Sequence, residues 1–275
     1  MIVELKQKDF YMCKGLLDDN GQLEARAVVE GVNPGRVFVD DSINPVTGVI
    51  WLGNNDGFIF IGDEGNEKFN SELNNFIDEV ILEEAKKVGL EWFEGIGNHP
   101  KWDSTIEKIF VNRKLGSWNQ RVYRLNKEDF IMNLKLEVDE GYEVRRINSL
   151  LVENRGGAIE NIGFLQSKIS ETWTSAEDFF KKGIGYCVVH DNQLVSLCLS
   201  GFVVGNVHCI DIVTLDTHRG RRLAQLAAHH FVKECMEKNH VPYWDCMEKN
   251  KPSIAVAEKL GFQQTGSYRG YEFVL

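Results

Sequence analysis

The stretch Asp211-Ile-Val-Thr-Leu-Asp-Thr-His-Arg-Gly-Arg-Arg-Leu-Ala224 lies where one hydrophobic pattern gives way to another. The run from Cys209 to Leu215 is apolar and β-branched apart from Asp211 and Thr214, which predicts a strand covered on both faces. From Ala224 onward, small or apolar residues recur at the spacing of a helix with one buried face. The sequence therefore predicts a strand, a turn rich in arginine and glycine, and a long helix.

The turn itself carries an unusual concentration of positive charge. Arg219, Arg221 and Arg222 surround Gly220 at the point where the helix is expected to begin. The first turn of a helix has N–H groups without internal partners and partial positive charge, so it can bind an anion. Arginines at this end oppose the helix dipole, and helix stability alone does not favour them. A bound di- or polyphosphate would explain the cluster, and a solvated surface cluster is the alternative.

The common nucleotide motifs do not account for this turn. The chain has no G-x-x-x-x-G-K-[ST] run and no glycine fingerprint of a dinucleotide site. Instead, Thr214–Ala224 resembles the acetyl-CoA-binding motif of the GCN5-related N-acetyltransferase (GNAT) superfamily, written Q/R-x-x-G-x-G/A. Gly220 matches the first glycine. Thr217 stands where Gln or Arg is usual, and Arg222 stands where the second glycine is expected.

A second stretch, from Asn250 to Phe262, resembles a later motif of the same superfamily, an Asn, a helix and a closing K-x-G-F. In the superfamily this Asn ties the splayed strands together beside the coenzyme, and the helix packs near the coenzyme A arm. The resemblance therefore implies that Asn250 and Ser253 belong to the coenzyme site. Many members carry a tyrosine that protonates the departing thiolate, and Ala257 stands at its place.

The resemblance extends over the whole chain. Trp244-Asp-Cys, Gly183-Ile-Gly-Tyr-Cys-Val-Val-His and Val37-Phe-Val-Asp-Asp are similar to a two-domain bacterial branch that includes a zwittermicin-resistance acetyltransferase. From residue 142 the predicted order of strand, helices, hairpin, strand, long helix, strand, helix, strand and strand is that of a GNAT domain. Agreement between motif and topology strengthens both.

The resemblance implies an acetyl-CoA-dependent N-acetyltransferase, in which the amine of a small molecule attacks the thioester directly within a ternary complex. No metal is expected. The central strand would hydrogen-bond the pantetheine arm through Ile212, Val213 and Thr214. The pyrophosphate would lie over Arg219, Gly220, Arg221, Arg222, Leu223 and Ala224. A coenzyme A-binding or phosphate-ligand sensor without catalysis is the alternative function.

Two polar residues on the central strand are candidates for the general base. Asp211 and His208 point to opposite faces of a regular strand, because their numbers differ by an odd count. An imidazole titrates near neutral pH without help, whereas Asp211 lies nearer the coenzyme segment. Hydrogen bonding within the sheet is the alternative for either. Cys246 is a further candidate, for the missing acid, and Trp244 is expected in the core.

Two domains are expected, an N-terminal α+β domain over 1–138 and a GNAT acetyltransferase domain over 139–275. The second should contain a mixed, mostly antiparallel sheet flanked by helices, which makes the fold class α/β or α+β. In the first domain, short β-rich runs with a turn at 54–57 precede a helix expected over 71–88. This domain could be a degenerate GNAT-like copy, although no sequence repeat is evident.

Composition sets the remaining expectations. The formal charge of −10 argues against nonspecific nucleic-acid binding. No apolar run approaches the roughly 20 residues that span a bilayer, and the N-terminus lacks a signal-peptide pattern, so a cytoplasmic protein without membrane partners is expected. The six cysteines have no C-x-x-C spacing and are predicted to be reduced core residues. A small-molecule amine is the expected partner, and a homodimer is left open.

Overall fold

The computed structural model describes residues 1–53 and 57–275, so the turn expected at 54–57 lies mostly outside the described residues. The chain forms two compact units. The first comprises Met1–Gln120 and Ser267–Leu275, and the second comprises Arg121–Gly266. The domain assignment 1–138 and 139–275 stays a prediction. The α/β fold class with a mostly antiparallel sheet flanked by helices is confirmed.

The first unit contains a sheet in the order β1-β2-β3-β4-β5-β12. Its strands are β1 (Val3–Glu4), β2 (Gly35–Val39), β3 (Thr47–Leu52), β4 (Phe58–Gly62), β5 (Trp92–Gly97) and the C-terminal part of β12 (Gln263–Val274). Its helices are η1 (Gln7–Leu16), α1 (Leu23–Val29), α2 (Glu67–Phe76), η2 (Ile77–Ile81), α3 (Leu82–Val88) and α4 (Trp102–Ile109). The pairs are antiparallel except β4 with β5, which is parallel.

The second unit contains strands in the order β11-β10-β9-β8-β7. These are β7 (Glu143–Arg146), β8 (Gly185–His190), β9 (Gln193–Val204), β10 (Val207–Thr214) and β11 (Val241–Met247). Its helices are η3 (Lys127–Asp129), α5 (Ser149–Glu153), α6 (Ile162–Thr172), α7 (Ala176–Lys182), η4 (Asp216–His218), α8 (Leu223–Glu237) and α9 (Lys251–Lys259). The strand β6 (Gly116–Arg124) begins in the first unit and ends in the second.

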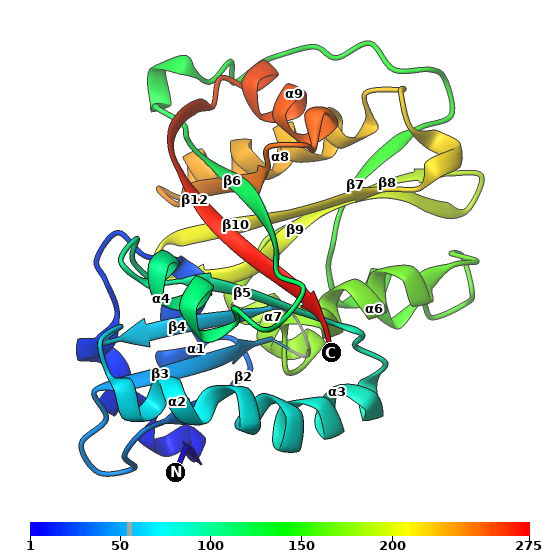
Figure 1. The fold of residues 1–275 in the computed structure, drawn as a ribbon. Helices are drawn as coiled ribbons and strands as arrows, with labels where there is room; N and C mark the ends of the chain where they lie inside the picture. The colour runs from blue at the N-terminus through cyan, green and yellow to red at the C-terminus, as the bar shows by residue number, and fades with distance from the viewer. Residues whose placement is uncertain (54–56) are drawn as a thin grey trace. The chain divides into compact units, whose positions relative to one another are not determined.

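Helices cover both faces of the sheet in the second unit. Figure 1 shows α8 and α9 on one side of β8, β9 and β10, with α6 on the other side. The buried face of α8, with Ala227, Phe231 and Cys235, packs in one core with Val195 and Trp244 of the strands. Coverage on both faces explains why β9 is an almost continuous apolar run rather than an alternating one.

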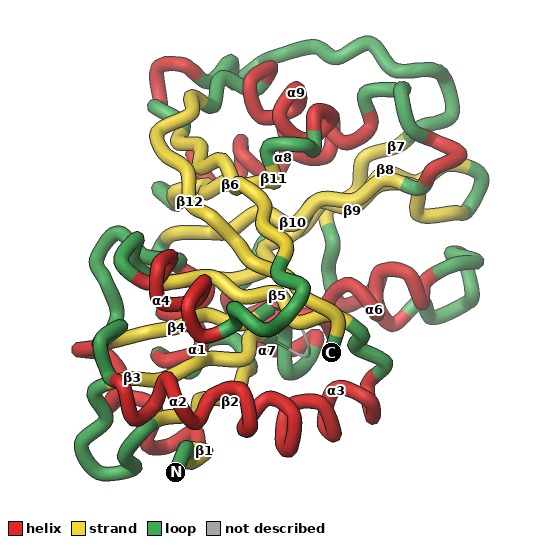
Figure 2. The backbone as a smooth tube through the Cα atoms, viewed as in Figure 1, coloured by secondary structure: helices red, strands yellow, loops and turns green. Residues whose placement is uncertain are grey.

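The two units repeat one order of elements. Each has a strand, helices, three strands, a long helical segment, a strand, a helix and a final strand. Figure 2 shows these strands in yellow and the helices in red. In each, the third and fourth strands are antiparallel and the fourth and fifth are parallel. This repeated topology supports the prediction that the N-terminal half is a GNAT-like copy.

Most local predictions are confirmed, and the misses have physical causes. The strand, turn and long helix around residues 209–238 are present, and all six cysteines are free and buried. The helix expected from Ser71 begins earlier, because Asn66 accepts a hydrogen bond from the Phe69 N–H and caps α2. The two strands expected at 262–266 and 271–275 are one strand, β12. No helix of the described residues is long and apolar enough to cross a membrane.

Candidate active site

The strand β10 pairs fully with one neighbour and only briefly with the other. Its antiparallel register with β9 runs from Val207 to Thr214 with an irregularity after His208. Its parallel register with β11 covers Val207, His208 and Cys209 and extends no further among the described residues. The remaining residues of β10 are half-buried, although a strand covered on both faces was expected. The two parallel strands therefore separate beyond Cys209.

The direction of the free backbone groups follows from the pairing with β9. The Leu215 N–H donates to Val195 O at 2.9 Å, and Ser196 Oγ donates to Val213 O at 3.2 Å. Alternate residues of a strand direct their N–H and C=O groups to the same neighbour. Those of Ile212 and Thr214 are therefore directed to the side on which β11 has separated. Such a row of free groups can bind an extended ligand that carries amides.

The two predicted base candidates lie on opposite faces of β10, as alternation predicted. Asp211 lies on the face covered by α6, where its Oδ2 is 3.3 Å from Lys168 Nζ. His208 lies on the face covered by α8, with its ring 6.5 Å from that of Phe231 between centroids. The irregularity in the β9 register does not bring the two side chains together.

His208 is enclosed in the core. It is 2% exposed, its Nδ1 is 2.9 Å from Ser200 Oγ, and its ring lies 4.6 Å from that of His240. Burial, assisted by His240 and Lys238, lowers the pKa of His208 to about 4. The imidazole is therefore neutral at neutral pH and almost wholly enclosed by protein. These contacts favour a structural role for His208.

The arginine-rich turn has the backbone that an anion site requires. Gly220 has φ of +80°, and Arg222, directly before α8, has φ of +63°. This left-handed conformation is the one that glycine adopts most easily. Arg222 therefore reproduces the backbone shape expected of the second glycine of the motif. The helix α8 has 15 residues, and no side chain caps its first turn.

The side chains of the turn are exposed and loosely paired. Arg219 contacts Asp216 at 2.8 Å, and Arg221 contacts Asp139 at 2.6 Å, with all four side chains about half exposed or more. Exposed pairs of this kind contribute little to stability and are readily exchanged for a ligand. Tyr142 directly precedes β7, and its hydroxyl lies 2.9 Å from His218 Nδ1. This hydrogen bond ties the turn to the start of β7.

The predicted residues of the later motif are built into α9. Asn250 Oδ1 accepts a hydrogen bond from the Ser253 N–H and so caps the helix. Ser253 Oγ in turn accepts one from Trp244 Nε1 at 3.1 Å, and Trp244 is in the core as expected. Ala257 is fully buried. Burial raises the pKa of the Cys246 thiol, which keeps this weaker candidate for the acid protonated.

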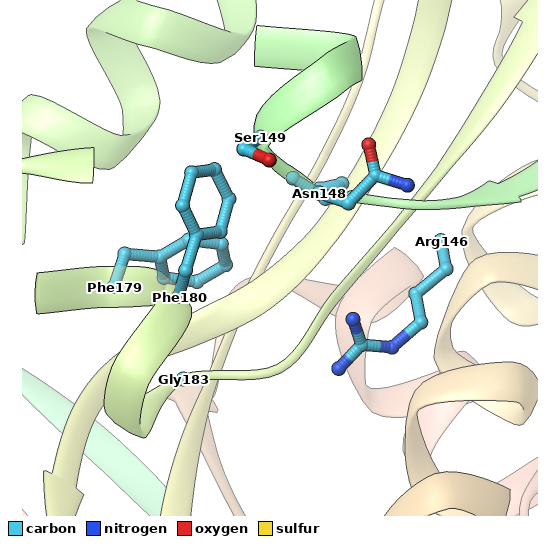
Figure 3. Close-up of a pocket in the computed structure, with 7 residues that line it drawn as sticks. Arg146, Asn148, Ser149, Phe179, Phe180 and Gly183 are labelled. Carbon is cyan, nitrogen blue, oxygen red and sulfur yellow. The ribbon is translucent and has the colours of Figure 1, made fainter. Parts of the chain in front are cut away.

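A separate cavity of about 180 Å³ lies at the end of β7 (Figure 3). It is lined by Arg146, Ile147, Asn148, Ser149, Phe179, Phe180 and Gly183. The Arg146 guanidinium donates two hydrogen bonds of 2.8 Å to Glu234, so its charge is already compensated. None of the predicted site residues lines this cavity. In the second unit the strands run in the order β11-β10-β9-β8-β7, so the cavity at β7 and the strand β11 lie at opposite ends of that order.

Comparison with known proteins identifies the family of the chain. The family model described as GNAT acetyltransferase matches residues 14–271. The chain belongs to this family and is an acyltransferase.

Relatives match along the whole chain. An uncharacterized N-acetyltransferase, YdfB, of Bacillus subtilis (strain 168) is 29% identical over 273 residues, covering 98% of both chains. The GCN5-related N-acetyltransferase-like protein from Streptococcus suis has a similar fold, with a TM-score of 0.71, 19% identity and coverage of 97% and 98%. A tandem GNAT protein from the clavulanic acid biosynthesis pathway has a TM-score of 0.61, 11% identity and coverage of 100% and 98%. Placement in the zwittermicin-resistance branch stays a prediction.

The burial of His208 gives a prediction for stability. The unfolded histidine binds a proton near its usual pKa of 6.5, and the folded one only near 4. The unfolded state therefore binds more protons between these values, and stability falls as the pH drops from 6.5 to 4. The contribution of His208 reaches roughly 3 kcal/mol. Urea unfolding of the wild type and of His208→Gln across this range should show a shallower decline in the variant, and parallel curves would contradict the assignment.

Proposed function

We propose that the second unit transfers an acetyl group from acetyl-CoA to the amine of a small molecule by direct attack in a ternary complex. The observation that carries the proposal is the free edge of β10 next to the uncapped start of α8. Acetyl-CoA supplies the acetyl group as a reactive thioester. The chain must hold that thioester and the amine in line, accept a proton from the ammonium form and stabilise the developing negative oxygen.

The free edge of β10 fits the pantetheine arm. The arm carries amides in an extended chain, and the N–H and C=O groups of Ile212 and Thr214 can pair with them as a neighbouring strand would. The N–H and C=O groups of Val213, between these two residues, are directed to β9 and so take no part in such pairing. An N–H of this edge can also donate to the thioester oxygen as negative charge develops.

The turn and α8 fit the pyrophosphate. The first N–H groups of α8, including those of Leu223 and Ala224, have no side-chain cap and lie at the positive end of a 15-residue helix. Arg219, Arg221 and Arg222 add charges that a phosphate can exchange for their present partners. Asn250 and Ser253 would support the coenzyme arm indirectly, by fixing the start of α9.

The first unit provides an internal contrast. Its strand β4 ends at Gly62, two residues after the last pair of its parallel register with β5, and Gly62 O lies 3.0 Å from His99 Nε2. The turn after β4 is acidic, with Asp63 and Glu64, and Asn66 caps the helix that follows. A short strand edge, negative charge and a capped helix all oppose coenzyme binding. One coenzyme per chain, in the second unit, follows from this difference.

We assign Asp211 as the general base that accepts the proton of the acceptor amine. It lies next to Ile212 on the central strand, its side chain is 29% exposed, and it faces α6 rather than the α8 core. Its carboxylate can take a proton from the acceptor's ammonium group, which frees the nitrogen lone pair to attack the thioester carbon. The second proton that the nitrogen loses as the intermediate collapses passes through water or Cys246 to the thiolate that leaves, because Ala257 replaces the usual tyrosine.

Substitutions of Arg222 can distinguish the effect of backbone conformation on coenzyme binding from the effect of charge. Arg222→Gly removes one cation and relieves the cost of about 1–2 kcal/mol that a residue with a Cβ pays in the left-handed conformation, whereas Arg222→Ala removes the cation and retains that cost. We expect calorimetry with coenzyme A to show one site per chain, a moderate loss of affinity for the glycine variant and a larger loss for the alanine variant. Arg155→Glu, at an exposed pair with Glu153, is the control. Equal affinity for coenzyme A in the wild type and all three variants would contradict the placement of the pyrophosphate at this turn.

The role of Asp211 is tested by turnover. Asp211→Asn should leave acetyl-CoA affinity nearly intact, lower kcat and flatten the acid limb of the pH–rate profile, because the carboxylate serves the chemistry and the backbone holds the coenzyme. The measurement is thiol release from acetyl-CoA with a panel of small amines. A stable variant with unchanged kcat would remove Asp211 from the mechanism. Coenzyme binding without thiol release from the wild type would instead favour the sensor, which the buried Ala257 makes the second candidate.

A further inference from the structure

Lys168 is the charged side chain that links α6 to the central strand. It comes from the middle of α6, where Leu165 and Ile169 form the buried side. Its Nζ lies 2.6 Å from Glu171 Oε2 on the same helix and 3.3 Å from Asp211 Oδ2 on β10. One ammonium group therefore bridges two carboxylates, one of which is the proposed base.

This bridge differs from the surface ion pairs of the same unit. The side chain of Lys168 is 19% exposed and that of Asp211 is 29% exposed. By comparison, the pair of Lys181 with Glu177 on α7 has exposures of 59% and 78%. Solvent screens a pair less when it is more enclosed, so the charge of Lys168 acts more strongly on its partners.

Lys168 keeps its charge despite its burial. Burial alone would lower the pKa of the ammonium group, but Asp211 and Glu171 outweigh it and the pKa of Lys168 is raised. The ammonium group of Lys168 therefore keeps its charge at neutral pH within the bridge. Without this cation, Asp211 would have the Glu171 carboxylate as its charged neighbour from α6.

The other neighbours of Asp211 do not replace that cation. From β9, the nearby Cys198 thiol is fully buried and its pKa is raised well above the usual value, so it stays neutral. From β11, strand alternation starting at the pair Cys209 and Tyr243 places Tyr243 and Asp245 on the same face as Asp211. Tyr243 has a phenol and Asp245 has a carboxyl group, so neither of these side chains supplies a cation.

We propose that Lys168 is a positioning residue for acetyl transfer, which holds the Asp211 carboxylate on the α6 face through the ion pair so that it can accept the proton of the acceptor amine. This proposal rests on the function proposed above. Glu171 completes the arrangement, because its tighter contact anchors the ammonium group to α6 when an acceptor approaches Asp211. In this way α6 contributes to the reaction through Lys168, which positions Asp211.

The test compares two substitutions of Lys168. Lys168→Gln removes the cation, so Asp211 should take up a proton at higher pH, and the acid limb of the kcat/KM profile should move up by about one pH unit. Lys168→Arg retains a cation and should restore the profile to within a few tenths of a unit. Lys181→Gln, which breaks the exposed pair on α7, should leave the profile unchanged. A bridge that only held α6 in place would lower the melting temperature of Lys168→Gln without moving the limb.

A direct titration keeps this proposal separate from the enzymatic one. Carbon-13 NMR of the side-chain carboxyl groups, with the Asp211 signal identified by its loss in Asp211→Asn, follows protonation without any substrate. The Asp211 signal should titrate at higher pH in Lys168→Gln than in the wild type and in Lys168→Arg. Superimposable titrations in folded proteins would overturn the inference, even if thiol release occurred. A shifted titration without thiol release from any amine would instead count against the proposed function.

Discussion

The end of backbone pairing between β10 and β11 is the constraint on which the site depends. A strand in the interior of a sheet normally has partners on both sides, because an unpaired backbone group away from water is costly. Beyond Cys209 the partner on one side is gone, and β10 becomes half-exposed where its apolar sequence predicts full burial. The same separation creates the row of donors and acceptors that an extended ligand needs and leads into the turn before α8.

The repeated fold shows that topology alone does not make a site. Both units place a helix directly after the fourth strand and a fifth strand parallel to it. In the first unit β4 ends two residues after its last pair with β5, Phe60–Gly97, and an aromatic core that includes Phe58, Phe93 and Phe110 fills the interior. In the second unit the strands separate and the turn is basic. On this fold, the backbone pairing of the central strand and the charge of the turn before the long helix therefore decide whether a site is present.

The sequence predicted what depends on local pattern. Periodicity gave the strand, turn and helix, and alternation placed Asp211 and His208 on opposite faces. The separation of β10 from β11 was not predictable, since it depends on a strand about 30 residues further along the chain. The left-handed backbone conformation of Arg222 was not predictable either, because that conformation is most often adopted by glycine.

The helix α6 was missed because its start lacks the usual signals. Asn161 precedes it without making a side-chain cap, and Gly156 and Gly157 lie shortly before. The spacing of Leu165, Ile169 and Thr172 was the available clue, because these buried residues follow a helical period. Lys168 could be identified only once this helix was placed against β10.

Amide hydrogen exchange along β10, measured by NMR with and without acetyl-CoA, tests the central claim most directly. Val213 and Leu215 direct their N–H groups to β9, whereas Ile212 and Thr214 direct theirs to the side that β11 has left. The account predicts that acetyl-CoA slows exchange at Ile212 and Thr214 and leaves Val213 and Leu215 unchanged. Equal slowing at all four amides, or no slowing at Ile212 and Thr214 while the coenzyme is bound, would contradict it.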